Sequence, residues 1–251
     1  MEQQLTQLVE QLKKTFGDRL VSAIHYGSAA VGDWIEKSSD LNVLCVLTQV
    51  SSRELGESEP IFRAWRNQGS PPPLLLTREE VLTSSDCFPM EFNDMKAHRR
   101  VLHGEDIIAQ VDVDRSFYRA QVEHELRAKQ LRLRQKAAEV LGKPDLLTKL
   151  LADSLSTFCV LGRHALILKG REPRWKKREV IADLEKVLGI RFEGFYAVLD
   201  VRAEGKRPAD TSAVLLFEKY LREVDALVRF VDQLDRPMSA DNQQLRGEQK
   251  A

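Results

Sequence analysis

The residues best suited to chemistry stand in two short stretches in the first fifth of the chain. An apolar run ending in Tyr26 stops abruptly at Gly27 and Ser28, and a second apolar run follows Asp40 and carries Asn42 near its start. Glycine allows a close backbone approach, so a Gly-Ser turn offers N–H groups and a hydroxyl to phosphate oxygens. A carboxylate and a carboxamide two residues apart offer oxygen ligands to Mg²⁺. These residue types predict a site for the phosphates of a metal-bound nucleotide.

Two strands of one sheet are the elements expected to position this site. Residues 20–26 are mostly apolar, and residues 41–47 form an almost unbroken aliphatic run, as is typical of a strand covered on both faces. Asp40 and Asn42 stand two apart, so a strand would point both side chains to one face. A helix is expected before the first strand, where apolar residues recur at helical spacing from Leu5 to Phe16.

Residues 87–95 contain the candidate for a third acidic group. Apolar and polar residues alternate there, which predicts a strand with Glu91 and Asn93 on one face. Glu91 is the preferred acid and Asp94 is the alternative, because the alternation turns Asp94 toward the apolar face of Phe92. The alternative hypothesis is that Glu91 is a solvent-exposed glutamate on an edge strand and has no catalytic role.

The stretch Tyr26-Gly27-Ser28, a polar spacer and Asp40-Leu41-Asn42 resemble the signature of the nucleotidyltransferase superfamily, the fold shared by DNA polymerase beta and the aminoglycoside adenylyltransferases. In some of the latter, the strand with the third acid is similar to Pro89-Met90-Glu91-Phe92-Asn93. The resemblance implies an α+β chain in which an N-terminal mixed β-sheet with flanking helices precedes an all-α bundle. The expected domains are a catalytic domain at 1–112 and a helical bundle at 113–235, with a disordered tail at 236–251.

The resemblance also implies a metal-binding and catalytic set of Asp40, Asn42 and Glu91. The family has an acid where this chain has Asn42. The amide keeps an oxygen ligand but removes a full negative charge, and Mg²⁺ prefers charged oxygen ligands. We therefore expect weaker binding of the ion that Asp40 and Asn42 share.

For the nucleotide, the resemblance implies that Gly27 and Ser28 bind its phosphates. Aminoglycoside-type enzymes carry a lysine between helices that reaches these phosphates. Lys177, or Lys176 beside it, is the counterpart expected here. The alternative is that this segment is a surface loop anchored by Trp175, without a role in nucleotide binding.

The rest of the chain is expected to be mainly helical. Polar breaks and helical spacing of apolar residues separate the predicted elements. Glu123 or Glu125 is a candidate general base for an acceptor. The predicted elements are a helix or broken pair at 51–66, a strand at 74–77, a helix or turn at 96–108, and helices at 117–141, at 146–168, after Pro173 and at 211–234.

Composition limits the partners and the compartment. The 251 residues carry 38 Lys plus Arg and 38 Asp plus Glu, and zero net charge argues against a nucleic acid as the main partner. The longest apolar runs fall short of the ~20 residues of a membrane helix. Cys45, Cys87 and Cys159 lie in apolar segments without CxxC spacing, so we expect buried thiols and a cytoplasmic protein. A homodimer stays open.

Two functions follow from these features. The first is a Mg²⁺-dependent transfer of a nucleoside monophosphate from a nucleoside triphosphate, expected to be ATP, to a hydroxyl of a small molecule or a protein. The second is a catalytically degenerate protein of the same fold that binds a nucleotide or a partner. Asn42 favours the second function, whereas the Gly-Ser turn, Asp40 and Glu91 favour the first.

Overall fold

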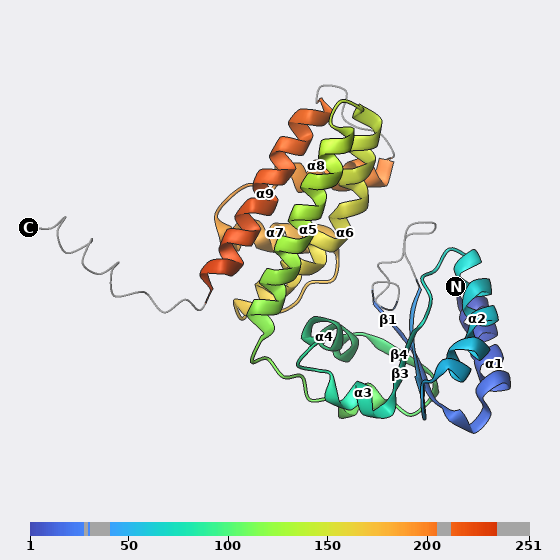
Figure 1. Cartoon of the computed structure of the whole chain (residues 1–251). Helices are drawn as coiled ribbons and strands as arrows, with labels where there is room; N and C mark the ends of the chain where they lie inside the picture. Colours follow the sequence, from blue (N-terminus) through green and yellow to red (C-terminus); the bar gives the residue numbers. More distant parts are fainter. Residues whose placement is uncertain (28–29, 31–40, 205–211, 235–251) are drawn as a thin grey trace, which may run out of the picture. The chain divides into compact units, whose positions relative to one another are not determined.

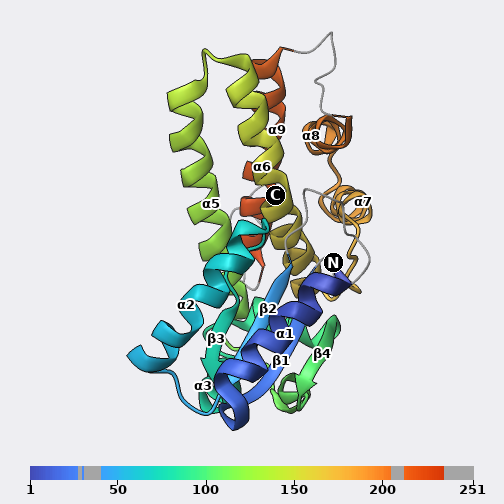
Figure 2. The ribbon, with the colours of Figure 1, turned by 90° about the vertical axis from the view of Figure 1, so that its right-hand side faces the viewer.

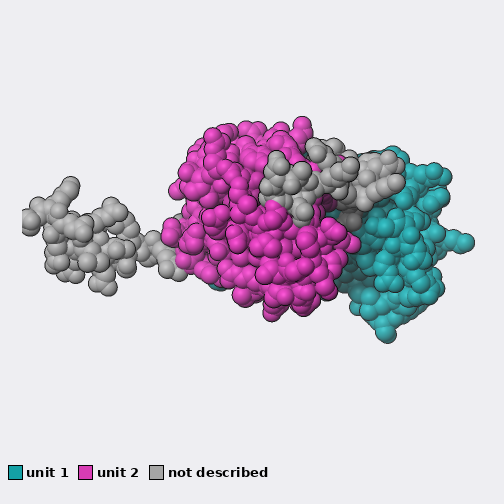
Figure 3. Space-filling view, turned by 90° about the horizontal axis from the view of Figure 1, so that it is seen from above, with its two compact units in different colours: residues 1–118 teal, residues 119–251 magenta. Residues whose placement is uncertain are grey.

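The chain folds into two compact units, Met1–Tyr118 and Arg119–Ala251, coloured separately in Figure 3. The computed structural model describes residues 1–27, 30, 41–204 and 212–234. The first unit contains a mixed sheet with helices, and the described residues of the second unit form helices. This arrangement confirms the expected α+β class. The units divide after residue 118, six residues beyond the boundary expected from sequence.

A four-stranded sheet forms the centre of the first unit, in the order β3-β2-β1-β4. The central strands are β1 (Leu20–Tyr26) and β2 (Asn42–Leu47), which pair antiparallel as the apolar runs predicted. Strand β4 (Arg99–Gly104) pairs antiparallel with β1, and β3 (Leu74–Thr77) pairs parallel with β2. Gly27 therefore follows the end of β1, and Asn42 begins the neighbouring strand β2.

Helices cover both faces of this sheet (Figure 1). The helices α1 (Glu2–Phe16) and α2 (Ser52–Asn67) pack on one face, and α3 (Arg78–Thr83) and α4 (Pro89–Ala97) pack on the other. Each face has its own apolar cluster. On the α1 face, β2 contributes Val43, Cys45 and Leu47. On the α4 face it contributes Leu44 and Val46, as the strand period of two requires.

Two of these helices begin with capping boxes. Ser51 caps α2 together with Glu54, and Thr77 caps α3 together with Glu80, which satisfies backbone N–H groups that the first turn leaves unpaired. Helix α2 runs unbroken through Pro60, so the single helix is correct and the broken pair is not.

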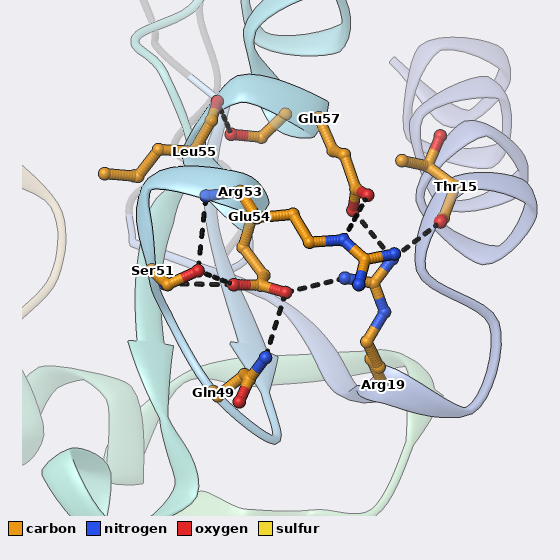
Figure 4. A network of polar contacts seen from close by, with 9 residues as sticks. Thr15, Arg19, Gln49, Ser51, Arg53, Glu54, Leu55 and Glu57 are labelled. Carbon is orange, nitrogen blue, oxygen red and sulfur yellow. Dashed lines mark hydrogen bonds and ion pairs between the residues drawn. The ribbon is translucent and has the colours of Figure 1, made fainter.

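A buried ion-pair network fixes the start of β1 to α2 (Figure 4). Arg19 precedes β1, and its guanidinium lies 2.7 Å from a Glu54 carboxylate oxygen and 2.6 Å from one of Glu57. The Glu54 side chain is fully buried. Hydrogen bonding, above all from the Ser51 hydroxyl, lowers the pKa of Glu54 to about 2. The charged network lies at the end of the sheet opposite Gly27.

Two predicted elements are wrong. Residues 87–95 were expected as a strand, but they turn at Cys87 and enter helix α4, which Pro89 begins. Proline suits a first helical position because its missing N–H is not needed there. Residues 96–108 were expected as a helix or turn but contain strand β4 and the 3₁₀ turn η3 (Ile107–Gln110). Cys87 was expected to be buried and is exposed, whereas Cys45 and Cys159 are buried.

The second unit is a helical bundle. In Figures 1 and 2 the helices α5 (Tyr118–Val140), α6 (Pro144–Leu168) and α9 (Ala213–Gln233) run alongside one another, while α7 (Lys177–Leu188) and α8 (Glu193–Glu204) run across them. The helix α6 is long and apolar enough for a membrane span, but 56% of its apolar window is buried in the protein. Such burial is typical of a core helix.

Candidate active site

The end of β1 and the start of β2 form the centre of the candidate site. Tyr26 and Asn42 are register partners across the two strands. Gly27 follows with φ of 91°, a conformation that residues with a side chain rarely adopt. The Ala30 N–H donates a hydrogen bond to the Gly27 carbonyl at 3.0 Å, so a tight turn begins at this glycine. Gly27, where the sequence placed a phosphate contact, is half-buried.

The Asn42 side chain lies directly against Gly27. A Cβ atom added to Gly27 would be 3.0 Å from the Asn42 amide nitrogen, 3.9 Å from Cγ and 4.0 Å from Cβ. The end of the carboxamide is thus the part of Asn42 nearest Gly27. Any larger residue at position 27 would push this amide aside.

The strand alternation settles which face of the sheet carries Asn42. Leu44 and Val46, two and four residues further along β2, belong to the apolar cluster that contains Phe92 and Met95 of α4. Asn42 consequently points to the face that α4 covers. The first turn of α4 carries Glu91, the third acid predicted from sequence.

Electrostatics places the Glu91 carboxylate near the end of β1. Burial raises the pKa of Tyr26, and the negative charge of Glu91 raises it further. Glu91 is exposed, whereas Tyr26 is half-buried at the end of β1. Asn42 thus lies against Gly27, Tyr26 stands at the end of the strand that precedes Gly27, and the charge of Glu91 on α4 acts on Tyr26. Sequence reasoning had treated Tyr26 only as the hydrophobic residue of the motif, and its position next to glycine was the signal available.

The original reason for preferring Glu91 over Asp94 is wrong. It rested on strand alternation, but both residues lie in helix α4, three positions apart, where side chains share a face. Asp94 is half-buried and Glu91 is exposed. The preference for Glu91 now depends on its electrostatic effect on Tyr26, and Asp94 remains the alternative.

Several predicted site residues cannot be placed in this cluster. Ser28 and Asp40 lie outside the described residues. Lys177 is the first residue of α7 in the second unit, and Lys176 is its N-cap. These four assignments stay predictions.

The two candidate bases in the second unit are both ion-paired. Glu123 pairs with Arg127 at 2.8 Å and with Arg119 at 2.6 Å, and these contacts lower its pKa. Glu125 lies 3.3 Å from the Lys129 ammonium. A carboxylate between two guanidinium groups is a weak base, so Glu123 is the less suitable of the pair.

The described residues supply part of what a nucleotide phosphate and its accompanying cation would need. The Asn42 side chain fills the space that a Cβ on Gly27 would enter. The Glu91 carboxylate supplies one charged oxygen group, the kind that Mg²⁺ prefers. Among residues 1–27, 30, 41–204 and 212–234, no three His, Cys, Asp or Glu side chains gather as metal ligands. Asp40 is not among these residues.

A solved adenyltransferase has a similar fold. The structure is similar to the crystal structure of the spectinomycin adenyltransferase AAD(9) from Enterococcus faecialis with ATP and spectinomycin, with a TM-score of 0.63. The match covers 93% of this chain and 100% of that chain, at 12% sequence identity. No protein-family model and no curated protein sequence matches the chain. The resemblance inferred from the sequence is therefore confirmed at the level of the fold.

Proposed function

We propose that this protein is a Mg²⁺-dependent nucleotidyltransferase. It transfers a nucleoside monophosphate from a nucleoside triphosphate, with ATP as the expected co-substrate, to a hydroxyl of a small molecule or protein. The observation that supports the proposal is the contact of Asn42 with Gly27 at one end of a sheet whose fold is similar to that of a solved adenyltransferase. The similar adenyltransferase was solved with ATP and a small molecule, which supports the choice of partners.

Each residue has a separate role in this proposal. Gly27 and Ser28 hold the terminal phosphates through the backbone and a hydroxyl. Asp40 and Glu91 are the carboxylates that hold Mg²⁺, and Asn42 stands as a neutral group in the position of the second acid. Lys177 contributes a positive charge to the phosphates. When bound, Mg²⁺ neutralises charge on the triphosphate and helps orient it for in-line attack.

Asn42 also supports a second candidate, a nucleotide- or partner-binding module without turnover. Replacing a carboxylate with an amide removes one of the charges that hold divalent cations. Loss of catalysis would follow if the reaction needs a second tightly held ion. The two candidates share nucleotide binding and differ in pyrophosphate release.

Pyrophosphate release distinguishes the two candidates. The protein is incubated with ATP, Mg²⁺ and a panel of hydroxyl-bearing acceptors, including amino sugars, aminocyclitols and proteins. An active transferase releases pyrophosphate with at least one acceptor, and Asp40→Ala abolishes the release. In the binding module, wild-type protein releases none, and Asn42→Asp creates or raises the activity. Release that is unchanged in Asp40→Ala would contradict the proposed site.

The location and assembly are part of the proposal. A reducing cytoplasm suits Cys45 and Cys159, which are both buried cysteines. Burial raises the pKa of Cys45 to about 12, so this thiol is unreactive. A soluble cytoplasmic enzyme, as a monomer or a homodimer, would meet both ATP and a small-molecule acceptor there.

A further inference from the structure

His25 is a buried histidine on the α1 face of the central sheet. Its neighbours in β1, Ile24 and Tyr26, pack on the α4 face. The strand period of two therefore turns His25 to the other face, where its register partner Val43 belongs to the apolar cluster with α1. The side chain is 2% exposed, and its Nε2 atom has no hydrogen-bond partner in the part of the chain that the structure describes. Such an atom is uncommon, because most buried polar groups are hydrogen-bonded.

Among the described residues, two charged groups act on His25, and they come from two different elements. Arg100 of the edge strand β4 is the register partner of His25 on the side away from β2. The Arg100 guanidinium lies 2.9 Å from the carboxylate of Glu2, the first residue of α1. The helix α2 contributes the apolar side chains of Ile61 and Trp65 to this face. Arg100 and Glu2 therefore determine the electrostatic surroundings of the imidazole.

Protonation of His25 is unfavourable while α1 covers it. Burial lowers the pKa of His25, the positive charge of Arg100 lowers it further, and the Glu2 carboxylate opposes both effects. The imidazole is therefore uncharged at pH 7. An imidazolium in this place would be a buried charge beside a guanidinium, and such a charge is costly unless water or an anion reaches it.

We propose that His25 is a pH-sensitive switch for the first turn of α1. With a neutral His25, the first turn stays on the sheet, where the Glu2–Arg100 ion pair holds it. A protonated His25 gains water or an anionic partner only when the Glu2 end of α1 leaves this place. Acidification therefore opens the first turn of α1. This inference does not depend on the proposed function.

The direction of the pH dependence follows from the lowered pKa of His25. In the open turn, His25 is in water and has its ordinary pKa of about 6.5, so the open turn binds more protons than the closed turn. The closed turn is therefore most stable above pH 6.5 and loses stability as the pH falls below that value. One proton changes the opening equilibrium by up to about tenfold per pH unit.

Hydrogen exchange of the whole chain between pH 5 and pH 7.5 tests the switch. The protection factors of the amides of residues 5–8, which correct for the intrinsic exchange rate at each pH, should fall by up to about tenfold per unit below pH 6.5. Those of residues 13–16, at the other end of α1, should stay constant. His25→Gln should remove the fall. His103→Gln, at a half-buried histidine of β4, should behave as wild type.

Two results would overturn the inference. One is protection at residues 5–8 that is constant from pH 7.5 to pH 5 in wild-type protein, and the other is an equal fall in wild type and His25→Gln. A second measurement needs no variant, so a misfolded His25→Gln does not decide the result. An NMR titration of the wild-type His25 imidazole should have a midpoint below pH 6.5, and a midpoint at or above pH 6.5 would also overturn the inference.

Discussion

At the residue scale, the site depends on a glycine for two separate reasons. The φ of 91° at Gly27 disfavours every residue with a Cβ, and the Asn42 amide occupies the space that a Cβ would enter. One effect acts on the backbone and the other on a side chain of the next strand. A substitution at Gly27 should therefore damage stability and the site together.

We expect Gly27→Ala to lower the free energy of unfolding by about 1–2 kcal/mol through the backbone alone, with a further loss from the displaced amide. ATP binding should fall more than stability does, because the turn itself is the proposed contact. Urea unfolding and calorimetry measure the two effects. The control is Gly56→Ala in the interior of α2, where a Cβ meets open space and should stabilise by about 0.5–1 kcal/mol. Equal behaviour of the two variants would contradict the role of Gly27.

Sequence patterns located the central pair of this site but not its third member. Gly27 and Asn42 were predicted to lie together because an apolar strand ending in Gly-Ser and a second strand opening after Asp40 resemble the nucleotidyltransferase signature. The basis for Glu91 was wrong, and its nearness to Tyr26 came only from the packing of α4 on the sheet. A tertiary contact of this kind leaves no local pattern.

At the element scale, the predictions for two neighbouring segments were wrong in opposite directions. The expected strand at 87–95 contains a helix, and the expected helix or turn at 96–108 contains a strand. In residues 87–95 the spacing of Met90 and Phe92 fits a strand, yet Phe92 and Met95 are buried at helical spacing. Pro89 was the signal for a helix start. Strand β4 escaped prediction because it is an edge strand whose charged residues, Arg99 and Arg100, hide the apolar alternation.

The network at Arg19 makes the link between β1 and α2 dependent on pH. Because the folded pKa of Glu54 is about 2, below its ordinary value, its ionised form stabilises the fold above the ordinary pKa of about 4.5. This contribution is lost as the pH falls from that value through about 2. At pH 7 we expect the urea midpoint of wild-type protein to be higher than that of Glu54→Gln.

The difference in urea midpoint should shrink steadily below about pH 4.5, where the Glu54 carboxylate of the unfolded chain protonates while that of the folded protein stays ionised. Glu59→Gln, which removes an exposed carboxylate paired with Arg63 on the same helix, is the matched control and should change little with pH. If the difference in urea midpoint between wild type and Glu54→Gln is constant from pH 7 to pH 3, the pKa of Glu54 is not lowered in the folded protein.

In the helical unit, a close approach of α8 and α9 depends on Gly194. A Cβ there would be 2.6 Å from the Tyr220 backbone nitrogen, and the Glu223 carboxylate accepts the N–H groups of Gly194 at 2.7 Å and Phe195 at 2.8 Å. Overpacking of this kind costs about 1–3 kcal/mol. We expect Gly194→Ala to lower unfolding stability by at least this amount.

Gly142→Ala is the control for that substitution, because a Cβ at Gly142 meets nothing within 4 Å. Thermal unfolding of both variants compares the two positions. If Gly194→Ala unfolds at the same temperature as Gly142→Ala, the close contact between α8 and α9 does not exist in solution.

Glu223 gives this contact a pH dependence of the opposite sign to that of Glu54. Burial raises the pKa of Glu223 to about 7, although its two backbone donors favour the carboxylate. A raised carboxyl pKa stabilises the fold fully below the ordinary value of about 4.5, and this contribution is lost as the pH rises through about 7. The stability of wild-type protein relative to Glu223→Gln should therefore fall between pH 5 and pH 8, as thermal unfolding at each pH would show. A constant or rising difference would contradict the burial effect.

At the scale of the whole molecule, the comparison of structures finds a similar protein where the comparison with family models finds none. No family model matches the chain, yet its structure matches an adenyltransferase over 93% of its length at 12% identity. The α+β class followed from the resemblance of residues 26–42, and the helices of the second half followed from hydrophobic periodicity, which many sequences can share. The acceptor did not follow, because its recognition depends on individual side chains rather than on periodicity.

The account depends most directly on ATP binding at the Gly27 turn. The decisive measurement is calorimetric titration of the whole chain with ATP in Mg²⁺, for wild type and for Asp40→Ala. We predict a single site in wild-type protein and a loss of about tenfold or more in affinity in the variant, because a charged metal ligand is removed. No heat of binding in wild type, or equal affinity in the two proteins, would contradict the account.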